Sequence, residues 1–516
     1  MSFANNRKSG WNIESLDRLV IALIALVLGA AFLLVARPIT KVFDRPLDED
    51  AYYALTVARH IGLGQGLTYD GTTLSNGFQP LWVLLCAPLF WLADGDRELG
   101  IRYVVAFHWV LYGLASILVS VLARQIFEKV TDRHASVAFL AALVFLSSPL
   151  IWMNSFSGLE TSLLLVCLLA SMIFYISIDV ENRRQLVSCG AFLGVLVLAR
   201  IDAVFFVIFL TLLQFLRKGA FEKRLLDAFC LSVPALLVSC PWWAFNVIAF
   251  GHLTPTSGIA LQDWAPTPFR YLHSAWSLVR DLTPQLYLST EETWPVAIAR
   301  AIAIGAAAFW VWPELCSLVR GLNRPTTEVL AALALSVVTL ALWYPSSSWA
   351  AFFYSRYFSP ASIVATLFWS LVILKMIRYL DRRLLAIGLT LMAAQIPAFV
   401  ALAYSPFYRG TSMLKEQLPL VLAHVPTNDW VAAGQSGTLG FMRDRVVNLD
   451  GRVNSEALKH QGGIPKYLSG NNILWIVDWP DYLANYLGSD PAKLGWSHIA
   501  TNGSMALYHY SGPPTR

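Results

Sequence analysis

Charged residues are scarce in this sequence. Asp, Glu, Lys and Arg make up 14% of the 516 residues, whereas 56% are hydrophobic, and the mean hydropathy is +0.55. About 20 apolar residues in a helix span a bilayer core of roughly 30 Å, and nearly charge-free runs such as 19–36 and 329–345 approach that length. Because only helices and closed barrels satisfy every backbone group in lipid, the composition predicts a polytopic helical membrane protein, mainly α.

Motifs for nucleotide or metal chemistry are also absent. The chain has no Walker loop, dinucleotide fingerprint, HExxH motif or GxSxG elbow. Its six cysteines lie in or beside apolar segments without metal-ligand spacing, which is typical of small buried side chains. The formal net charge of +5 is modest. The sequence therefore requires no cofactor and indicates no nucleic-acid partner.

Apolar segments and basic loops alternate along the chain. Eleven candidate spans lie at residues 19–36, 101–123, 137–154, 161–177, 186–201, 203–216, 228–250, 295–318, 328–346, 357–376 and 385–404. Every second loop is basic, through residues that include Arg7, Lys8, Arg124, Lys129, Arg133, Arg217, Arg224 and Lys375. Basic loops stay cytoplasmic, so we expect a cytoplasmic N-terminus. The first span lacks a cleavage site and is predicted to be a retained anchor.

Three regions are then expected outside the membrane: the loops 37–100 and 251–294, and everything after 404. In the loop 37–100, residues 50–61 show apolar residues at helical spacing. Residues 78–94 are apolar and aromatic but contain two prolines. Both segments are predicted to be helices at the membrane surface. Residues 1–404 form the predicted membrane module. Residues 405–516 are predicted to be a small α/β domain, with strands at 430–434, 438–442, 445–451, 472–479 and 504–510 and helices at 411–423 and 480–487.

Three adjacent acids, Asp48, Glu49 and Asp50, begin the first of these surface helices. Acids at a helix N-terminus cap free N–H groups and complement the helix dipole. A carboxylate beside an apolar surface also binds protons more tightly, and it can accept a proton from an alcohol as a general base. Both readings stay open from the residues alone.

Cations recur at the outer ends of the spans. Arg200 and Asp202 lie where one span turns into the next, and Arg356 begins another. An outer arginine either snorkels to lipid headgroups, forms a salt bridge or binds a phosphate. Arg200 has Asp202 and Glu160 as alternative partners. Glu160, in an outer turn, reads equally as a helix cap, and His252 lies in an outer loop.

Seven short motifs in order resemble the GT-C superfamily of polytopic glycosyltransferases. They are EDAYYALTVARH (49–60), GLGQGLTYDG (62–71), SNGFQPLW (75–82), SGLETS (157–162), LARIDA (198–203), SRYFSP (355–360) and GFMRDRVVNLDGRVN (440–454). Within that superfamily the chain is most similar to the mycobacterial terminal arabinofuranosyltransferases and their uncharacterised bacterial relatives. The resemblance covers most of the chain.

The resemblance implies inverting sugar transfer from a polyprenyl-phosphate donor. It implies Asp50 as the general base, Glu49 as its catalytic partner, and Arg356, with Arg200 as a second candidate, as the ligand of the leaving phosphate. Asp48 fits best as the helix cap. The remaining substrate-binding candidates are Asp48, Tyr52, Arg59, His60, Gln79, Glu160, Asp202, His252 and Tyr357.

The sequence does not decide whether the acceptor is a glycan, a lipid-linked saccharide or a protein. Membrane lipids are expected to surround the protein. No metal ligand is assigned, although the acids are compatible with a divalent ion. Departures from the family pattern at His60, Ile201 and Thr256 leave the sugar open, with arabinofuranose as one pentofuranose candidate. A flippase for a polyprenyl-linked substrate and a non-catalytic sugar-binding subunit are the alternatives; charge confined to span ends disfavours the flippase.

Overall fold

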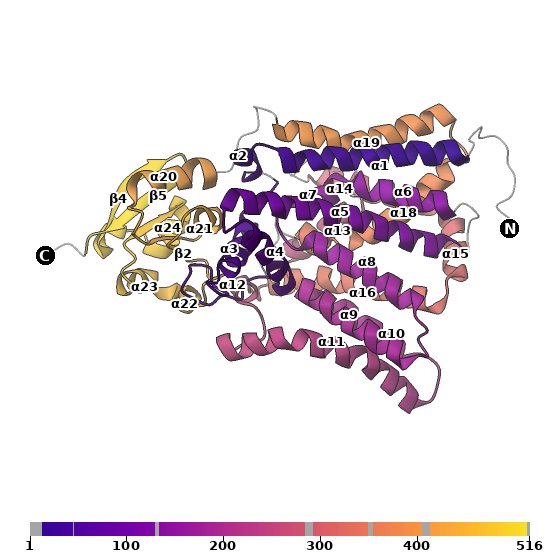
Figure 1. Cartoon of the computed structure of the whole chain (residues 1–516), viewed down its shortest axis with the longest axis horizontal. Helices are drawn as coiled ribbons and strands as arrows, with labels where there is room; N and C mark the ends of the chain where they lie inside the picture. Colours follow the sequence, from indigo (N-terminus) through magenta and orange to yellow (C-terminus); the bar gives the residue numbers. More distant parts are fainter. Residues whose placement is uncertain are drawn as a thin grey trace.

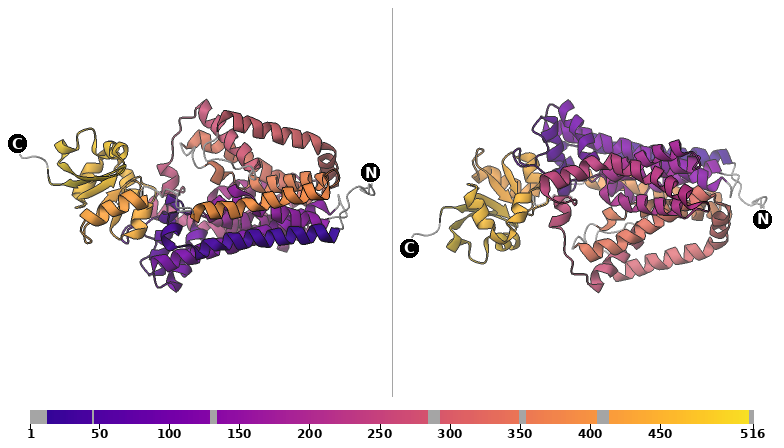
Figure 2. Two further views of the ribbon diagram at one scale, coloured as in Figure 1. Left: turned by 90° about the horizontal axis from the view of Figure 1, so that it is seen from above. Right: turned by 90° about the horizontal axis from the view of Figure 1, so that it is seen from below.

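The computed structural model describes residues 13–44, 46–128, 134–283, 293–348, 354–404 and 413–512. Its helices lie side by side in a long bundle, and a smaller domain sits at one end of that bundle (Figure 1). Two further views show the same separation between the helical part and the C-terminal domain (Figure 2). The predicted boundary at 404/405 lies at the edge of an undescribed stretch and stays a prediction.

Each predicted span is helical within the described ranges. The bundle helices are α1 (Ile13–Ala36), α5 (Arg97–Phe127), α6 (His134–Leu146), α7 (Pro149–Phe156), α8 (Thr161–Ser177), α9 (Arg183–Ala199), α10 (Val204–Phe215), α11 (Phe221–Phe250), α13 (Pro268–Leu282), α14 (Trp294–Trp310), α15 (Trp312–Gly321), α16 (Arg324–Ser347), α18 (Ala361–Met376) and α19 (Arg382–Tyr404). Two predicted spans are bent pairs, α6 with α7 at 63° and α14 with α15 at 66°. Pro149 is the first residue of α7 and Pro313 the second residue of α15, and in the first turn of a helix a missing N–H is tolerated.

Length and composition support a multi-pass membrane protein. Among the described residues, five helices are long and apolar enough to cross a membrane alone, and up to seven spans result if each bent pair counts as one. Several remaining helices, including α8, α10 and α18, are apolar but shorter. The total of eleven crossings therefore stays a prediction, whereas the polytopic helical architecture is confirmed.

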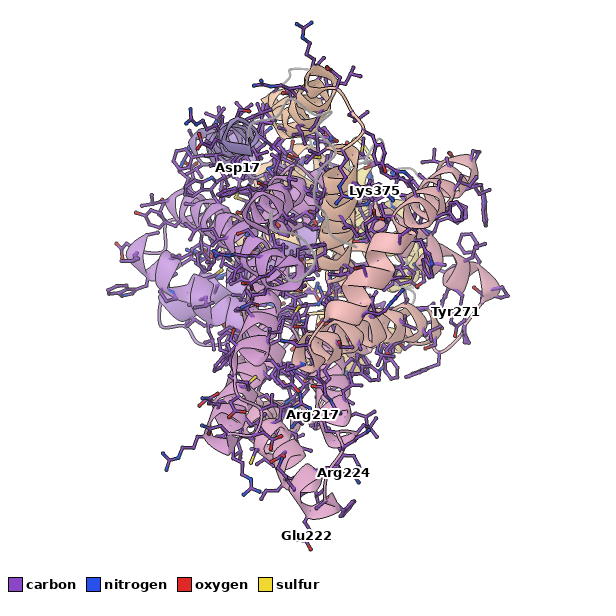
Figure 3. The ribbon with its side chains drawn as sticks, turned by 90° about the vertical axis from the view of Figure 1, so that its right-hand side faces the viewer. Asp17, Arg217, Glu222, Arg224, Tyr271 and Lys375 are labelled. Carbon is purple, nitrogen blue, oxygen red and sulfur yellow. The ribbon has the colours of Figure 1, made fainter. Side chains whose placement is uncertain are left out.

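Helix α1 begins at the end of the bundle that lies away from the C-terminal domain (Figure 1). Figure 3 looks onto the end away from that domain, where it labels Arg217, Arg224 and Lys375 together with Asp17 and Glu222. These three cations are among the basic residues used to orient the chain. Four further orienting residues, Arg7, Lys8, Lys129 and Arg133, lie outside the described residues, and sidedness remains a prediction.

The first outer loop forms two helices, α3 (Glu49–Gly62) and α4 (Pro80–Leu92), next to the short α2 (Ile39–Val42). Helix α4 exposes Leu84, Trp91 and Leu92, as expected of a surface helix. Helix α3 is different, because most of its residues are buried and it packs against α4 and the C-terminal domain. It therefore lies inside the protein and not with a free face on the membrane.

The C-terminal domain holds a five-stranded sheet in the order β2-β1-β3-β5-β4. Its strands are β1 (Val431–Ala433), β2 (Val446–Asn448), β3 (Trp475–Asp478), β4 (Trp496–Asn502) and β5 (Met505–Tyr510). Strands β1, β2 and β3 are parallel, and β5 is antiparallel to both β3 and β4. Helices α20 (Leu418–His424), α21 (Gly437–Met442), α22 (Ser455–Lys459), α23 (Ile464–Gly470) and α24 (Pro480–Leu487) complete the domain.

Two expectations for this domain were wrong. Residues 438–442, predicted to be a strand, belong to helix α21, and strand β4 was not predicted. The cause of the first error is tertiary, because α21 docks directly on α3. A Cβ on Gly437 would overlap the backbone oxygen of Glu49, and one on Gly440 would overlap the Tyr69 hydroxyl. Gly437 permits a close approach of α21 to α3, and Gly440 permits one to the loop that carries Tyr69. An apolar run reveals neither contact.

The domain is also seated on the loop that precedes α4. A Cβ on Gly77 would overlap the carbonyl oxygen of Arg452. Asn448, at the end of β2, reaches the backbone oxygen of Gly434 and the hydroxyl of Ser436. The carboxyl ends of the parallel strands therefore face α3, the edge where open α/β sheets usually bind ligands.

Candidate active site

A cavity of about 370 Å³ lies where the first outer loop, the bundle and the C-terminal domain meet. Its polar lining comprises Asp50, Gln79, Glu160, Arg200, Asp202, Arg356 and Arg452. Its aromatic lining comprises Phe205, Trp264, Trp343, Tyr344 and Tyr357. One cavity thus joins several charged groups to an apolar wall, the combination expected for a ligand with a charged head and a hydrocarbon tail.

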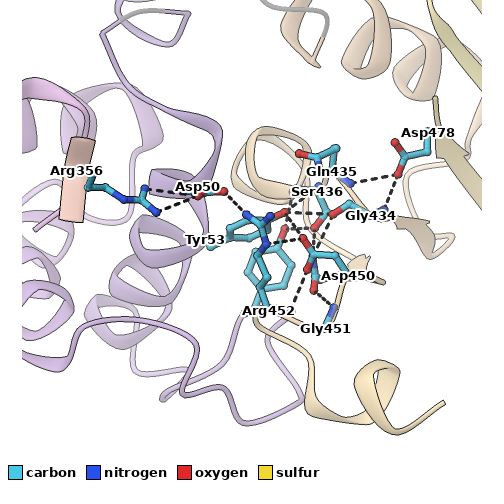
Figure 4. Close-up of polar contacts among 12 residues, drawn as sticks. Asp50, Tyr53, Arg356, Gly434, Gln435, Ser436, Asp450, Gly451, Arg452 and Asp478 are labelled. Atoms are coloured by element: carbon cyan, nitrogen blue, oxygen red, sulfur yellow. Dashed lines mark hydrogen bonds and ion pairs between the residues drawn. The ribbon is translucent and has the colours of Figure 1, made fainter. Parts of the chain in front are cut away.

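Asp50 lies between two arginines (Figure 4). Arg452 from the C-terminal domain donates to Oδ1 at 2.5 Å, whereas Arg356 approaches Oδ2 at 3.4 and 3.5 Å. The Asp50 side chain is 17% exposed, so it is partly shielded but reachable from the cavity. The carboxylate is held firmly through one oxygen and loosely through the other.

Arg452 is held in turn by Asp450. The Nε of Arg452 lies 3.2 Å from Oδ2 of Asp450, and Oδ1 accepts from the Arg452 backbone at 2.9 Å. Burial alone would lower the pKa of Arg452, but Asp50 and Asp450 raise it, so the guanidinium stays charged. The pKa of Asp450 is itself raised by burial. The hydroxyl of Tyr53 completes the cluster 3.4 Å from Asp450.

A third guanidinium, that of Arg200, is already paired on two sides. It lies 2.9 Å from Asp202 and 3.3 Å from Glu160, and its side chain is 2% exposed. Tyr344 donates to Asp202 at 2.7 Å and stacks on Tyr357 with ring centroids 4.0 Å apart. Arg200 is thus paired with both sequence-proposed carboxylates. Its charge is compensated, so Arg356 is the better placed of the two to meet an anion.

The other two acids of the triplet have different partners from Asp50. Glu49 accepts from the backbone of Thr438 at 3.0 Å and from its hydroxyl, which ties α3 to α21. Burial raises the pKa of Glu49 to about 7. Asp48 is the N-cap residue of α3, yet its side chain accepts no hydrogen bond from the first turn. The structure therefore gives the three acids three different surroundings.

The remaining sequence-proposed residues divide into three groups. Gln79 and Tyr357 line the cavity, and Gln79 accepts from the backbone of Ile201 at 3.1 Å. Tyr52 points away and donates to the Phe43 carbonyl at 2.6 Å. His252 contacts the carbonyl of Thr254 and is not among the lining residues.

Arg59 and His60, the last two candidates, line a second cavity between the first outer loop and the C-terminal domain. Metal binding has no cluster to support it in the described ranges, where no three His, Cys, Asp or Glu side chains converge.

Four residues of the site were not proposed from the sequence: Tyr53, Tyr344, Asp450 and Arg452. Tyr53 is one position after the proposed Tyr52, and a helix turns each successive residue by about 100°, so only one of them faces the cavity. Asp450 and Arg452 lie in the motif NLDGRVN that carried the family resemblance. Their position just after a strand was the available signal.

Solved structures resemble this one in fold. No known family profile matches the chain, and neither does any curated protein. ArnT from Cupriavidus metallidurans, bound to undecaprenyl phosphate, aligns with a TM-score of 0.57 at 14% identity over 95% of this chain and 97% of that one. AglB from Archaeoglobus fulgidus, an archaeal oligosaccharyltransferase in complex with an inhibitory peptide and a dolichol-phosphate, aligns with a TM-score of 0.53 at 13% identity over 95% and 74%.

The chain shares its overall fold with these polytopic membrane proteins. An oligosaccharyltransferase from Archaeoglobus fulgidus, tethered to an acceptor peptide, aligns with a TM-score of 0.51 at 14% identity over 95% of this chain and 74% of that one. At such low identity the similarity establishes a shared fold and neither the activity nor the substrate. The finer resemblance to terminal arabinofuranosyltransferases stays a prediction.

Proposed function

We propose that this protein is a glycosyltransferase of the EC 2.4 class that uses a polyprenyl-phosphate-linked sugar. The acceptor is a glycan, a lipid-linked saccharide or a protein. The cavity supports this proposal because it offers guanidinium groups for a phosphate and aromatic side chains for a prenyl chain. Solved structures of the same fold hold undecaprenyl phosphate or dolichol-phosphate.

The unequal contacts of Asp50 carry the proposal. A donor phosphate competes with the Asp50 carboxylate for Arg356, because that ion pair is long at 3.4 Å. Binding of the phosphate then releases Oδ2, while Arg452 keeps Oδ1 in place at 2.5 Å. The released oxygen is positioned to act as a general base. Donor binding thereby prepares the base in the same event that engages the leaving group.

The transfer step balances with these groups alone. The acceptor hydroxyl oxygen forms a bond to the anomeric carbon, on the face opposite the phosphate. The bond from that carbon to the phosphate oxygen breaks, and its electron pair stays on the phosphate beside Arg356. The acceptor proton passes to Oδ2 of Asp50. The configuration at the anomeric carbon is inverted, and no external oxidant or cofactor is consumed.

The proposal includes a location and a sugar class. The site faces the outer side of a bacterial inner membrane, with the N-terminus cytoplasmic and the C-terminal domain outside, as the charge bias predicts. The sugar is proposed to be a pentofuranose such as arabinofuranose, following the family resemblance. Asp202, Glu160 and Tyr357 would shape the donor site through Arg200 and the stacked tyrosines.

The test compares Asp50→Asn with the wild type. Purified protein in proteoliposomes is incubated with a panel of polyprenyl-phosphate sugars, and products are identified by mass spectrometry. Asp50→Asn should lower the transfer rate by at least about 100-fold, the usual contribution of a general base. Asp96→Asn is the matched control, since Asp96 is an exposed N-cap in the same outer loop and Asn caps equally well. Unchanged transfer in Asp50→Asn contradicts the base assignment.

A transport assay on the same proteoliposomes separates the competing function. Movement of a lipid-linked sugar between leaflets without any new glycosidic bond would replace the proposal by a flippase.

A further inference from the structure

A second cavity, of about 390 Å³, lies between the first outer loop and the C-terminal domain. It is as large as the candidate active site and within the size range of ligand pockets. The motif GLGQGLTYDG supplies Gln65, Tyr69 and Asp70, and the motif GFMRDRVV supplies Arg443 and Arg445. Two sequence motifs therefore meet in one cavity. The proposed reaction does not account for all the residues of either motif.

The lining offers both hydrogen-bond donors and acceptors around an aromatic ring. Arg59, Arg443 and Arg445 carry donors, Asp70 and Asp444 carry acceptors, and Trp430 provides an apolar face. Sugar hydroxyls donate and accept at once, and the faces of sugar rings are apolar. A free phosphate is an anion, and the two carboxylates of Asp70 and Asp444 would repel it. The mixture of groups therefore suits a saccharide better than an anion.

The conformation of the walls is set by the protein itself. His60 has its Nδ1 2.9 Å from the carbonyl of Thr68, so Nδ1 carries the proton and Nε2 is an acceptor. Burial lowers the pKa of His60, which keeps the ring neutral. Asp70 accepts from the backbones of Thr72 and Thr73 at 2.8 and 2.7 Å and so fixes the loop. Arg445 has a φ of 62°, an uncommon conformation for a residue with a side chain.

The position of this cavity relates it to the active site. Helix α3 contributes Asp50 and Tyr53 to one cavity and Arg59 and His60 to the other. Nine residues of helix separate Asp50 from Arg59, which corresponds to about 13 Å along the axis. Between the cavities, the rings of Tyr53 and Tyr69 lie 5.7 Å apart. Several sugar units of one chain are enough to cover that separation.

We propose that this cavity is a saccharide-binding subsite that holds non-reacting sugar units of a glycan acceptor. The inference rests on the proposed transferase function and narrows its acceptor to an oligosaccharide. Binding at remote units holds the acceptor near Asp50 and lowers the entropic cost of reaching the transition state. The subsite lies on the C-terminal domain side, so it also assigns that domain a substrate-binding role.

Saturation-transfer difference NMR tests this on the full chain in nanodiscs, with a panel of linear oligosaccharides of two to six units. Trp430→Leu keeps apolar packing against the domain core, and Thr72→Arg places a bulky side chain in the opening from an exposed position. At least one oligosaccharide should bind the wild type, and both variants should weaken that binding 10-fold or more. Asp50→Asn should bind as well as the wild type, which separates this result from loss of the transfer reaction.

Three outcomes overturn the subsite. They are no oligosaccharide bound at millimolar concentration, equal binding by the wild type and both pocket variants, and binding of an acceptor peptide at this cavity in place of any oligosaccharide. Unchanged sugar transfer in Asp50→Asn contradicts the proposed reaction. The NMR result is then still an independent measurement of saccharide binding. The thermal unfolding temperature of each variant verifies that lost binding does not reflect lost folding.

Discussion

Arg452 donates to Oδ1 of Asp50 at 2.5 Å across a sequence separation of 402 residues. The two residues come from different parts of the protein, one from the C-terminal domain and one from the first helix of the first outer loop. Asp450 and Arg356 extend the contact on either side. The proposed general base is therefore completed only when the C-terminal domain is seated on the membrane module.

The first prediction concerns this contact. Arg452→Ala should lower kcat for sugar transfer by 10-fold or more with little change in the KM for donor, because Arg452 positions Asp50 and does not meet the leaving phosphate. Arg452→Lys should restore part of the rate. An unchanged kcat in Arg452→Ala would exclude a role through Asp50.

Arg356 and Arg200 should respond differently to removal. Arg356→Ala should fold and raise the KM for donor, with a loss of about 2 kcal/mol or more in donor recognition, the value of a hydrogen bond to a charged group. Arg200→Ala leaves Glu160 and Asp202 buried without their cation, which costs about 3 to 5 kcal/mol of stability. Thermal unfolding and donor titration distinguish the two. If Arg200→Ala raised the KM for donor and Arg356→Ala mainly lowered stability, Arg200 would be the phosphate ligand and Arg356 the structural residue.

Seating of the C-terminal domain depends on a glycine. Gly77→Ala should weaken the contact between the first outer loop and the domain, because the added Cβ overlaps the carbonyl of Arg452. Faster limited proteolysis after residue 404 and reduced transfer are the expected results. Gly29→Ala is the control, since a Cβ there meets nothing within 4 Å. Equal proteolysis rates for both variants would show that this close approach is not needed.

Glu49 should make stability depend on pH. Burial raises its pKa from 4.5 to about 7 in the folded protein, so the folded state binds this proton more tightly than the unfolded state does. Its contribution is therefore fully present below about pH 4.5 and is lost as the pH rises towards 7. Thermal unfolding of the wild type from pH 4.5 to 7 should show this loss, and Glu49→Gln should remove it. Parallel profiles for the two proteins contradict the assignment.

A metal requirement is not expected. Asp50 is compensated by two guanidinium groups, and Glu49 is engaged by Thr438, so the triplet does not present its carboxylates jointly to a cation. EDTA should leave the transfer rate unchanged within about twofold. A large loss that Mg²⁺ or Mn²⁺ restores would mean that the carboxylates rearrange around a metal when the donor binds.

The bundle was predictable because its signal is local. Long apolar runs such as 19–36 and 385–404 are helices in the structure, since lipid leaves the backbone few alternatives. Helix α21 and strand β4 were not predictable in the same way. In a domain whose strands are three to seven residues long, contacts with other elements outweigh local propensity.

The candidate site divides along the same line. Asp50 could be selected because its position within a recognisable motif can be counted along the sequence. Arg200 could be paired with Asp202 because they are neighbours in sequence. Arg452 could not be placed against Asp50, since no periodicity links residues so far apart. Tyr52 was proposed, but Tyr53 lines the cavity. The two are neighbours on one helix, and the sequence does not determine which of them that helix turns toward the cavity.

The amino-acid sequence by itself determined a polytopic helical protein with a polar C-terminal domain, because hydropathy and charge alternation act residue by residue. It also determined that acids begin the first outer helix. Only the tertiary structure decided which acid the arginines hold, because that choice depends on glycines that let the C-terminal domain approach α3 closely. The role proposed for Asp50 as general base therefore depends on that contact.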